Sequence, residues 1–320
     1  MRVAVLDDTM RVAAGLADWA SLGSETTVDF VEAHLDPDAL VARIADAEVV
    51  VAMRERTPID AAVLDRLPAL RLLITTGMRN AAIDVGHALD RGVTVCGTGA
   101  GQTPTAELTW ALILGLVRDV AVNDRVVRAG GWQTRPGGDL AGRTLGIVGL
   151  GRLGSRVARV AKAFDMDVIA WSPHLTPERA SEGGARAVSK QALFREADIV
   201  SIHLVLSEAT RGVVGADEIA QMSPQSFLVN CSRSALVDQD ALRSAIEGGR
   251  IGGAALDVFA EEPLPHESWM ASSDRVLLSP HMGYVTEGNY ALMYADVVED
   301  VRAWREGSPL RLLDRPPVQS

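Results

Sequence analysis

The chain has little cysteine, and the two cysteines it has are isolated. Among 320 residues only Cys96 and Cys231 carry thiols, and neither has a cysteine or histidine at metal-ligand spacing. This scarcity argues against a disulfide framework and against a zinc site. We therefore expect two buried free thiols and no bound metal.

Long hydrophobic runs are also missing. The longest uncharged apolar run within a helical pattern, residues 111–117, falls far short of the roughly 20 residues that a membrane-spanning helix needs. The first residues, MRVAVLDD, have no apolar core before their acids and predict no signal peptide. We expect a cytoplasmic protein without a membrane partner.

Positive charge is in deficit. The formal net charge is −11, and no block of lysine or arginine offsets it. Such a chain binds phosphate backbones poorly, because its overall field repels them. The composition therefore predicts no nucleic-acid partner.

Short apolar runs alternate with helix-period segments through most of the chain. This alternation is typical of βα units that build parallel sheets, so we expect an α/β protein. Two separate series of strands make two sheets more economical than one. The expected strands are residues 2–7, 26–31, 48–53, 70–76 and 93–96 in the first series, and 143–151, 167–172, 198–204, 226–232, 252–259 and 275–280 in the second.

Two long helices are expected outside this alternation. Residues 103–120 are apolar on nearly every side, which predicts burial between domains or between subunits and is our reason to expect a homodimer. Residues 291–307 form a closing helix that could return the chain to the first domain.

A glycine loop follows the first strand of the second series. Gly149-x-Gly151-x-x-Gly154 stands between an apolar strand and a helix. In this setting Gly149 allows a tight turn, Gly151 lets the backbone approach a pyrophosphate, and Gly154 permits close packing of the helix. The loop predicts a dinucleotide site, whereas a plain glycine-rich turn is the simpler alternative.

The end of the next strand bears on the choice of cofactor. NAD-binding sites usually carry an acid there, which binds the adenosine ribose, but this strand ends in Trp171 and Ser172. Ser172 and His174 could donate hydrogen bonds to a 2′-phosphate, so we favour NADP over NAD. No arginine is expected at this point, because Arg179 lies a helical turn or more farther on. The alternative is a turn that tolerates either cofactor.

Three later strands end in polar residues of complementary chemistry. Arg233, Glu262 and His281 each follow an apolar run, and the carboxyl ends of strands in an open sheet face the ligand. Arginine suits a planar 2-oxo carboxylate, and histidine can protonate a carbonyl oxygen as hydride reaches carbon. A carboxylate from Glu262 beside His281 would favour the imidazolium and fix its tautomer.

The motifs around these residues resemble the D-isomer specific 2-hydroxyacid dehydrogenase family, which includes glyoxylate and hydroxypyruvate reductases. The matching stretches are GRTLGIVGLGRLG, VNCSRSALVDQDAL, GGAALDVFAEEPLP and SPHMGYVT, at the family's intervals. The resemblance covers nearly the whole length. It implies a discontinuous, flavodoxin-like substrate domain at residues 1–98 and 287–320, and a Rossmann domain at 99–286.

The same resemblance implies roles for individual residues. Arg233, Glu262 and His281 are expected to be catalytic, and Asp257 to hold the nicotinamide carboxamide. Further cofactor contacts are implied at Thr76, Arg152, Leu153, Leu204, Cys231, Ser232 and Gly283, and substrate contacts at Arg54, Gly77, Met78, Arg233 and Tyr284. Backbone amides of residues 75–81 are expected to receive the substrate carboxylate.

Together these features predict an NAD(P)H-dependent reductase that converts a small 2-oxo acid to the D-2-hydroxy acid. Tyr284 departs from the small residue that many members carry after the His-x-Gly turn, and we expect it to line the substrate site. The alternative is a dinucleotide-sensing binding protein, similar to the corepressors that share this fold.

Overall fold

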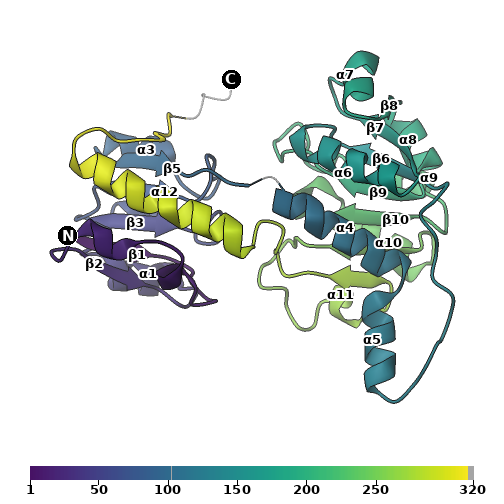
Figure 1. Ribbon diagram of the computed structural model, residues 1–320, viewed down its shortest axis with the longest axis horizontal. Helices are drawn as coiled ribbons and strands as arrows, with labels where there is room; N and C mark the ends of the chain where they lie inside the picture. The colour runs from purple at the N-terminus through teal and green to yellow at the C-terminus, as the bar shows by residue number, and fades with distance from the viewer. Residues whose placement is uncertain (102, 316–320) are drawn as a thin grey trace. The chain divides into compact units, whose positions relative to one another are not determined.

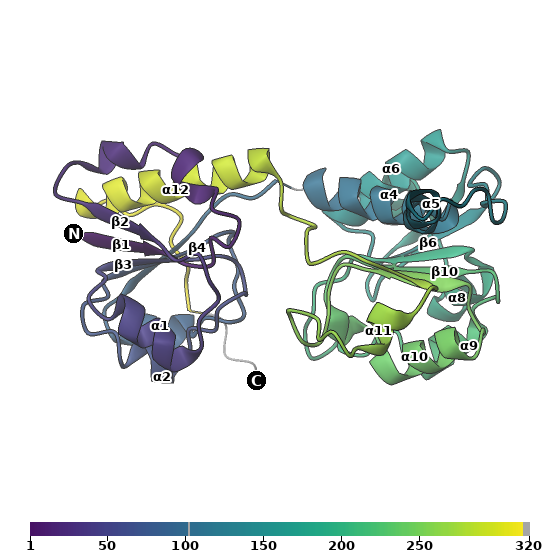
Figure 2. The ribbon, with the colours of Figure 1, turned by 90° about the horizontal axis from the view of Figure 1, so that it is seen from below.

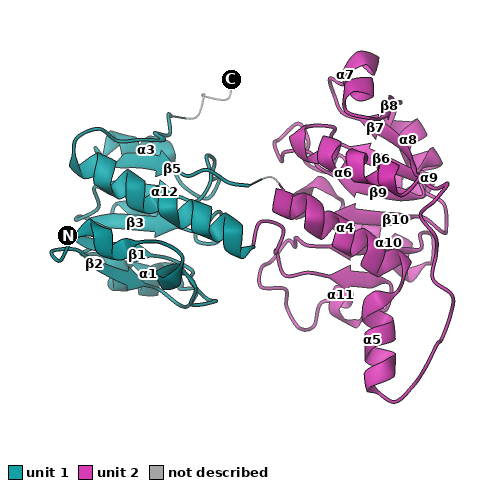
Figure 3. Ribbon diagram, in the orientation of Figure 1, with its two compact units in different colours: residues 1–101, 286–320 teal, residues 102–285 magenta. Residues whose placement is uncertain are grey.

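The computed structural model describes residues 1–101 and 103–315. Contacts along the chain divide it into two compact units (Figure 3). Unit 1 comprises residues 1–101 and 286–320, and unit 2 comprises residues 102–285. Unit 1 is therefore built from both ends of the chain.

Unit 1 is a five-stranded parallel sheet with helices on both faces. Its strands are β1 (Arg2–Val5), β2 (Thr27–Phe30), β3 (Val49–Ala52), β4 (Leu72–Thr75) and β5 (Thr94–Gly97), in the order β2-β1-β3-β4-β5. This is the flavodoxin-like order of a doubly wound sheet, as expected. Its helices are α1 (Pro37–Ile44), α2 (Ala61–Leu64), α3 (Val85–Asp90) and α12 (Glu287–Arg305). Figure 2 shows α12 on one face of the sheet, with α1 and α2 on the other.

Unit 2 is a seven-stranded parallel sheet in the order β12-β11-β10-β9-β6-β7-β8. Its strands are β6 (Thr144–Val148), β7 (Asp167–Trp171), β8 (Arg186–Ala187), β9 (Ile199–Ile202), β10 (Phe227–Asn230), β11 (Gly253–Leu256) and β12 (Val276–Leu278). Counted from β6, the first six strands, β6 to β11, follow the Rossmann order, with β12 added at one edge, and the order reverses between β6 and β9. A ligand is expected outside the carboxyl ends of the strands at this reversal.

Helices cover both faces of the second sheet (Figure 1). They are α4 (Thr103–Val117), α5 (Val120–Arg128), α6 (Arg152–Ala163), α7 (Pro177–Glu182), α8 (Lys190–Glu196), α9 (Ala216–Gln221), α10 (Gln239–Glu247) and α11 (Trp269–Ser272). In Figure 2, α4 and α6 lie on one face, and α8, α9 and α10 lie on the other. This sandwich buries strands that are apolar on both sides, which explains their continuous hydrophobic runs.

Each strand that the sequence predicts is confirmed, and the closing helix does return the chain to unit 1 as α12. One strand, β8, was not predicted from the sequence. β8 consists only of Arg186 and Ala187, which pair with β7 but carry no apolar run. The two residues pair with β7 at the edge of the sheet, where the chain arrives after helix α7.

The apolar helix of residues 103–120 was expected to be buried between domains or between subunits, and this expectation was wrong in part. The apolar side chains of α4 pack largely within unit 2, against α6 and β11. Trp110 belongs to the hydrophobic core of this unit, and its indole nitrogen donates to the carbonyl of Val157 at 3.3 Å. Burial of α4 therefore does not require a second domain or subunit.

Candidate active site

The glycine loop of unit 2 has the space and conformation that a dinucleotide needs. Gly149 has a φ of 104°, and an added Cβ would lie 2.8 Å from the backbone of His203. A Cβ on Gly154 would lie 2.4 Å from the Gly149 carbonyl oxygen, whereas one on Gly151 would meet nothing within 4 Å. Gly151 also caps the twelve-residue helix α6. The open backbone and the helix N-terminus fit a pyrophosphate.

Ser172, at the end of β7, is joined to this loop. Its hydroxyl accepts a hydrogen bond from the Leu150 amide at 3.0 Å. A turn follows, closed by the amide of Leu175 on the Ser172 carbonyl at 3.2 Å. The expectation that no arginine lies at this turn was wrong, because Arg179 folds back from α7 and donates to the His174 carbonyl at 3.1 Å.

His281 and Glu262 form a close pair. The Nδ1 atom of His281 lies 2.6 Å from a Glu262 carboxylate oxygen, and the other oxygen accepts from the Phe259 amide at 2.9 Å. Burial opposes ionisation of Glu262, but the hydrogen bonds from His281 and Phe259 and the charges of His281 and Arg233 outweigh it and lower its pKa. Glu262 is therefore the ionised partner, and Nδ1 is the imidazole nitrogen that it engages.

The backbone after His281 is fixed from two sides. Asp257 is fully buried, and its two carboxylate oxygens accept the amides of Met282 and Gly283, each at 2.8 Å. Burial raises the pKa of Asp257, although hydrogen bonds from Ser279 and these amides oppose the shift. From the first turn of α4, the hydroxyl of Thr105 donates to the Gly283 carbonyl at 2.9 Å.

These bonds hold an unusual backbone. His281 has a φ of 55°, in the left-handed region that residues with a Cβ seldom adopt. Its amide donates to the Ser279 carbonyl at 3.0 Å, across Pro280. The ring of Tyr284 packs on the imidazole with an interplanar angle of 83° and a centroid distance of 5.7 Å. The orientation of His281 thus depends on its neighbours on every side.

Arg233 follows β10 and is held by its own turn. The side chain of Asn230 donates to the Arg233 carbonyl at 3.0 Å and accepts the Ser232 amide at 2.9 Å. The Arg233 guanidinium donates to the Ser232 carbonyl at 2.8 Å. Ser232 in turn donates from its hydroxyl to the Leu204 carbonyl at 2.6 Å. This turn therefore links the ends of β9 and β10.

The remaining predicted residues of unit 2 flank these groups. Arg152 and Leu153 open helix α6, directly after the glycine loop. Cys231 is buried, and this burial raises the pKa of its thiol to about 12, so it stays protonated. No group of three or more possible metal ligands occurs among residues 1–101 and 103–315. No helix in this described part is long and apolar enough to span a membrane.

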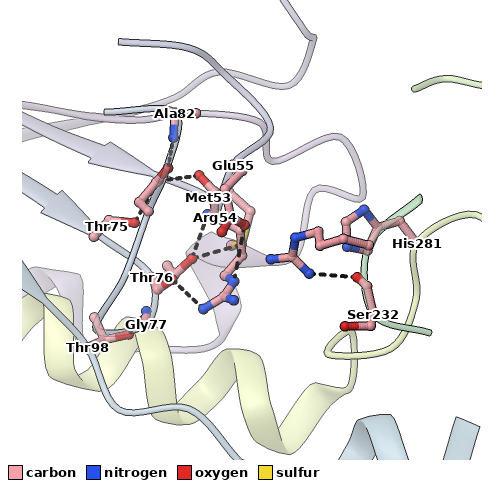
Figure 4. Close-up of polar contacts among 12 residues, drawn as sticks. Met53, Arg54, Glu55, Thr75, Thr76, Gly77, Ala82, Thr98, Ser232 and His281 are labelled. Carbon is pink, nitrogen blue, oxygen red and sulfur yellow. Dashed lines mark hydrogen bonds and ion pairs between the residues drawn. The ribbon is translucent and has the colours of Figure 1, made fainter. Parts of the chain in front are cut away.

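In unit 1, the predicted substrate residues gather after β3 and β4. Figure 4 shows the Arg54 guanidinium turned toward Thr76, where Nη1 donates to the Thr76 carbonyl at 3.3 Å. The buried hydroxyl of Thr76 accepts the Arg54 amide at 2.9 Å, and the Gly77 amide donates to the Thr98 hydroxyl at 2.8 Å. Gly77 has a φ of 90°, and Met78 is 47% exposed.

The loop after Gly77 has unused donors. Among the described hydrogen bonds, none involves the backbone amides of residues 78–81. Successive amides without protein acceptors can bind an anion. Within residues 75–81, where the substrate carboxylate is expected, the amides of Thr76 and Gly77 already have acceptors in the protein.

The sequence did not predict the contact of Thr105 or the position of the Arg179 side chain. Thr105 lies far from Gly283 in the chain, and no local pattern connects them. Arg179 lies too far along the chain for the sequence to predict its contact with the β7 turn, because separation in the chain does not show where a long side chain reaches. The polar residues at the strand ends, by contrast, could be predicted from the sequence, because each follows an apolar run.

We expect Thr105→Val to lower turnover several-fold by releasing one side of the turn that carries His281, with a change in the pH profile of turnover. A lost hydrogen bond of this kind costs about 1 kcal/mol, which corresponds to roughly a 5-fold effect. Thr105→Ser retains the hydroxyl and should restore the profile. A pH profile of Thr105→Val identical to that of the parent chain would contradict this role.

Known proteins share both the sequence pattern and the fold. The profile of the D-isomer specific 2-hydroxyacid dehydrogenase NAD binding domain matches residues 110–283. A glyoxylate reductase from Aeropyrum pernix is 39% identical over 82% of this chain and 81% of its own length. A D-3-phosphoglycerate dehydrogenase from Synechocystis sp. is 34% identical over 84% of this chain but only 50% of its own length.

The chain thus spans about half the length of the curated D-3-phosphoglycerate dehydrogenases that it matches. Among solved structures, a putative D-3-phosphoglycerate dehydrogenase from Ralstonia solanacearum superposes with a TM-score of 0.92 at 32% identity, covering 97% of this chain and 96% of that one. Identity at this level over most of both chains, together with the profile match, establishes the relationship. The chain belongs to the D-isomer specific 2-hydroxyacid dehydrogenase family.

Proposed function

We propose that this protein reduces a small 2-oxo acid to the D-2-hydroxy acid with NAD(P)H. The observation that carries this proposal is the His281–Glu262 pair in the same unit as a glycine loop that fits a dinucleotide. Arg233 contributes positive charge to this pair, which suits an anionic substrate. Catalysis is assigned to Arg233, Glu262 and His281.

His281 supplies the proton. Glu262 engages Nδ1 of His281, which leaves Nε2 as the nitrogen that would deliver a proton to the carbonyl oxygen of the substrate. When bound, the reduced nicotinamide supplies a hydride to carbon 2, and the two additions together convert the carbonyl to a hydroxyl. Arg233 polarises the carbonyl and pairs with the substrate carboxylate.

The substrate carboxylate is assigned to unit 1, the proposed substrate domain. The amides of residues 78–81 and the cationic Arg54 support this assignment, since both favour an anion. Gly77 gives the loop its left-handed turn, with a φ of 90°. Met78 is a further proposed substrate contact. Tyr284, in unit 2, is proposed to limit the size of the substrate's side chain.

The cofactor is assigned to unit 2, and NADP is preferred over NAD. Ser172 stands where an acid would repel a 2′-phosphate, and its hydroxyl already approaches the glycine loop. The proposed cofactor contacts in unit 2 are Gly149, Gly151, Arg152, Leu153, Gly154, Ser172, His174, Leu204, Cys231, Ser232, Asp257 and Gly283. Thr76 of unit 1 is proposed as a further contact. The two carboxylate oxygens of Asp257 already accept the Met282 and Gly283 amides. A hydrogen bond to the nicotinamide carboxamide would therefore be an additional one.

The substrate class is a short 2-oxo acid such as glyoxylate or hydroxypyruvate, or a larger 2-oxo acid. Relatives named glyoxylate reductase match over most of their length, which supports this class. The curated relatives named D-3-phosphoglycerate dehydrogenase match over about half of theirs, although a solved structure of that name matches over nearly its whole length. We place the reaction in the cytoplasm.

The direct test is oxidation of NADPH and of NADH with a panel of 2-oxo acids. We expect turnover on at least one acid, with the higher kcat/KM for NADPH, because no carboxylate opposes the 2′-phosphate. Absorbance at the nicotinamide band follows the reaction. Binding of NADPH without turnover on any acid would instead favour a dinucleotide-sensing protein, and a preference for NADH would contradict the cofactor assignment.

His281→Ala should lower kcat by about 10²-fold or more, the range for a lost general acid. NADPH should still bind, because the glycine loop is untouched, and fluorescence titration measures this. His266→Ala is the matched control, since His266 is exposed and lies outside the proposed site. Near-parental turnover of His281→Ala would refute the assignment.

We further propose that two chains form a homodimer through α5 and the segment after it. None of the residues of α5 is buried, and in Figure 1 this helix extends away from the sheet of unit 2. Val120, Val127 and Trp132 are 56%, 54% and 72% exposed, an unusual concentration of apolar surface. Light scattering should give the mass of two chains, and the mass of one chain would refute the dimer.

A further inference from the structure

A basic side chain lies over the turn that follows β7. This turn, residues 172–175, is closed by the hydrogen bond from the Leu175 amide to the Ser172 carbonyl at 3.2 Å. Arg179 comes from the first half of α7 and donates from Nη1 to the His174 carbonyl at 3.1 Å. Its guanidinium is therefore held beside the turn, although the residue lies several positions farther along the chain.

The same turn borders the glycine loop. The Ser172 hydroxyl meets the Leu150 amide at 3.0 Å, one residue before Gly151. In the Rossmann arrangement the pyrophosphate lies over this loop and the adenosine ribose lies at the end of the second strand, which is β7 here. Arg179 thus stands next to the place where the ribose 2′ position is expected.

The Arg179 guanidinium has N–H donors that make no hydrogen bond among the described residues. Among the described residues, no hydrogen bond or ion pair uses Nε or Nη2 of Arg179, and its side chain is exposed. Neighbouring Glu178 is engaged elsewhere, since its carboxylate accepts from its own amide and from the Thr176 hydroxyl. The positive charge at the turn is therefore not neutralised by a paired acid, although Glu178 remains nearby.

We propose that Arg179 is the residue that selects NADPH, by binding the adenosine 2′-phosphate through Nε and Nη2. This inference rests on the NADPH preference proposed above and names the group responsible for it. A guanidinium presents two parallel N–H groups that match two oxygens of a phosphate monoester. The bond from Nη1 to His174 holds this fork in place before the cofactor arrives, which lowers the entropy lost on binding.

Ser172 and His174 support this binding of the 2′-phosphate indirectly. Ser172 removes the acid that would repel the phosphate, and its hydroxyl is already engaged by the Leu150 amide. His174 provides the carbonyl that orients Arg179. A purely structural role for Arg179, tying α7 to the turn, is the competing explanation, and it predicts equal effects on ligands with and without the phosphate.

Adenosine 2′,5′-bisphosphate and AMP separate these explanations, because they differ only in the 2′-phosphate. Calorimetric titration of the full chain should show tighter binding of the bisphosphate. In Arg179→Ala this binding should weaken by about 10- to 100-fold, the range for a lost charge-assisted hydrogen bond, while AMP binding stays unchanged. Arg179→Lys should retain part of the preference, since it keeps the charge without the fork.

Arg186→Ala is the matched control, because it removes one positive charge from β8 of the same unit, where Arg186 pairs with Glu196. It should leave both ligands unaffected. If the parent chain binds the two ligands equally, the NADPH preference itself fails. If the parent prefers the bisphosphate but Arg179→Ala keeps that preference, or loses affinity for both ligands equally, the role of Arg179 is overturned while the preference stands.

Discussion

The buried carboxylate of Asp257 fixes the backbone on which the proposed chemistry depends. It has no exposed surface, and its two oxygens are occupied by the successive amides of Met282 and Gly283. An unpartnered charge in this position would be costly, so the carboxylate and the turn stabilise each other. Because His281 adopts a left-handed backbone immediately before these amides, its imidazole is oriented by packing and hydrogen bonds rather than by local preference.

The parallel topology explains why so much chemistry gathers in unit 2. Every strand of its sheet runs in the same direction, so the loops that follow β6, β7, β10 and β12 share one edge. The glycine loop, the turn beside Arg179, Arg233 and His281 all lie on these loops. A rigid sheet, apolar on both faces, therefore holds polar groups that are far apart in the chain.

Charge is distributed in accord with the anionic ligands of the proposed reaction. The chain carries a net charge of −11, yet Arg54 and Arg233 follow strands closely, and Arg179 reaches from α7 to the turn after β7. Long-range attraction of anions is therefore weak, and the proposed recognition of anions relies on short hydrogen bonds from these guanidinium groups. Each of the three donates to a backbone carbonyl, which restricts its orientation before a ligand binds.

The sequence by itself determined the α/β class, all strands but β8 and the glycine loop, and it predicted the trio Arg233, Glu262 and His281, of which the structure brings His281 and Glu262 into contact. These follow from local patterns, because apolar periodicity and glycine spacing report what each short segment can form. Only the tertiary structure decided that α4 packs within unit 2, that Thr105 holds Gly283, and that Arg179 reaches the β7 turn. Such contacts depend on how distant elements pack and on which rotamer a long side chain adopts, and neither is encoded in a local pattern.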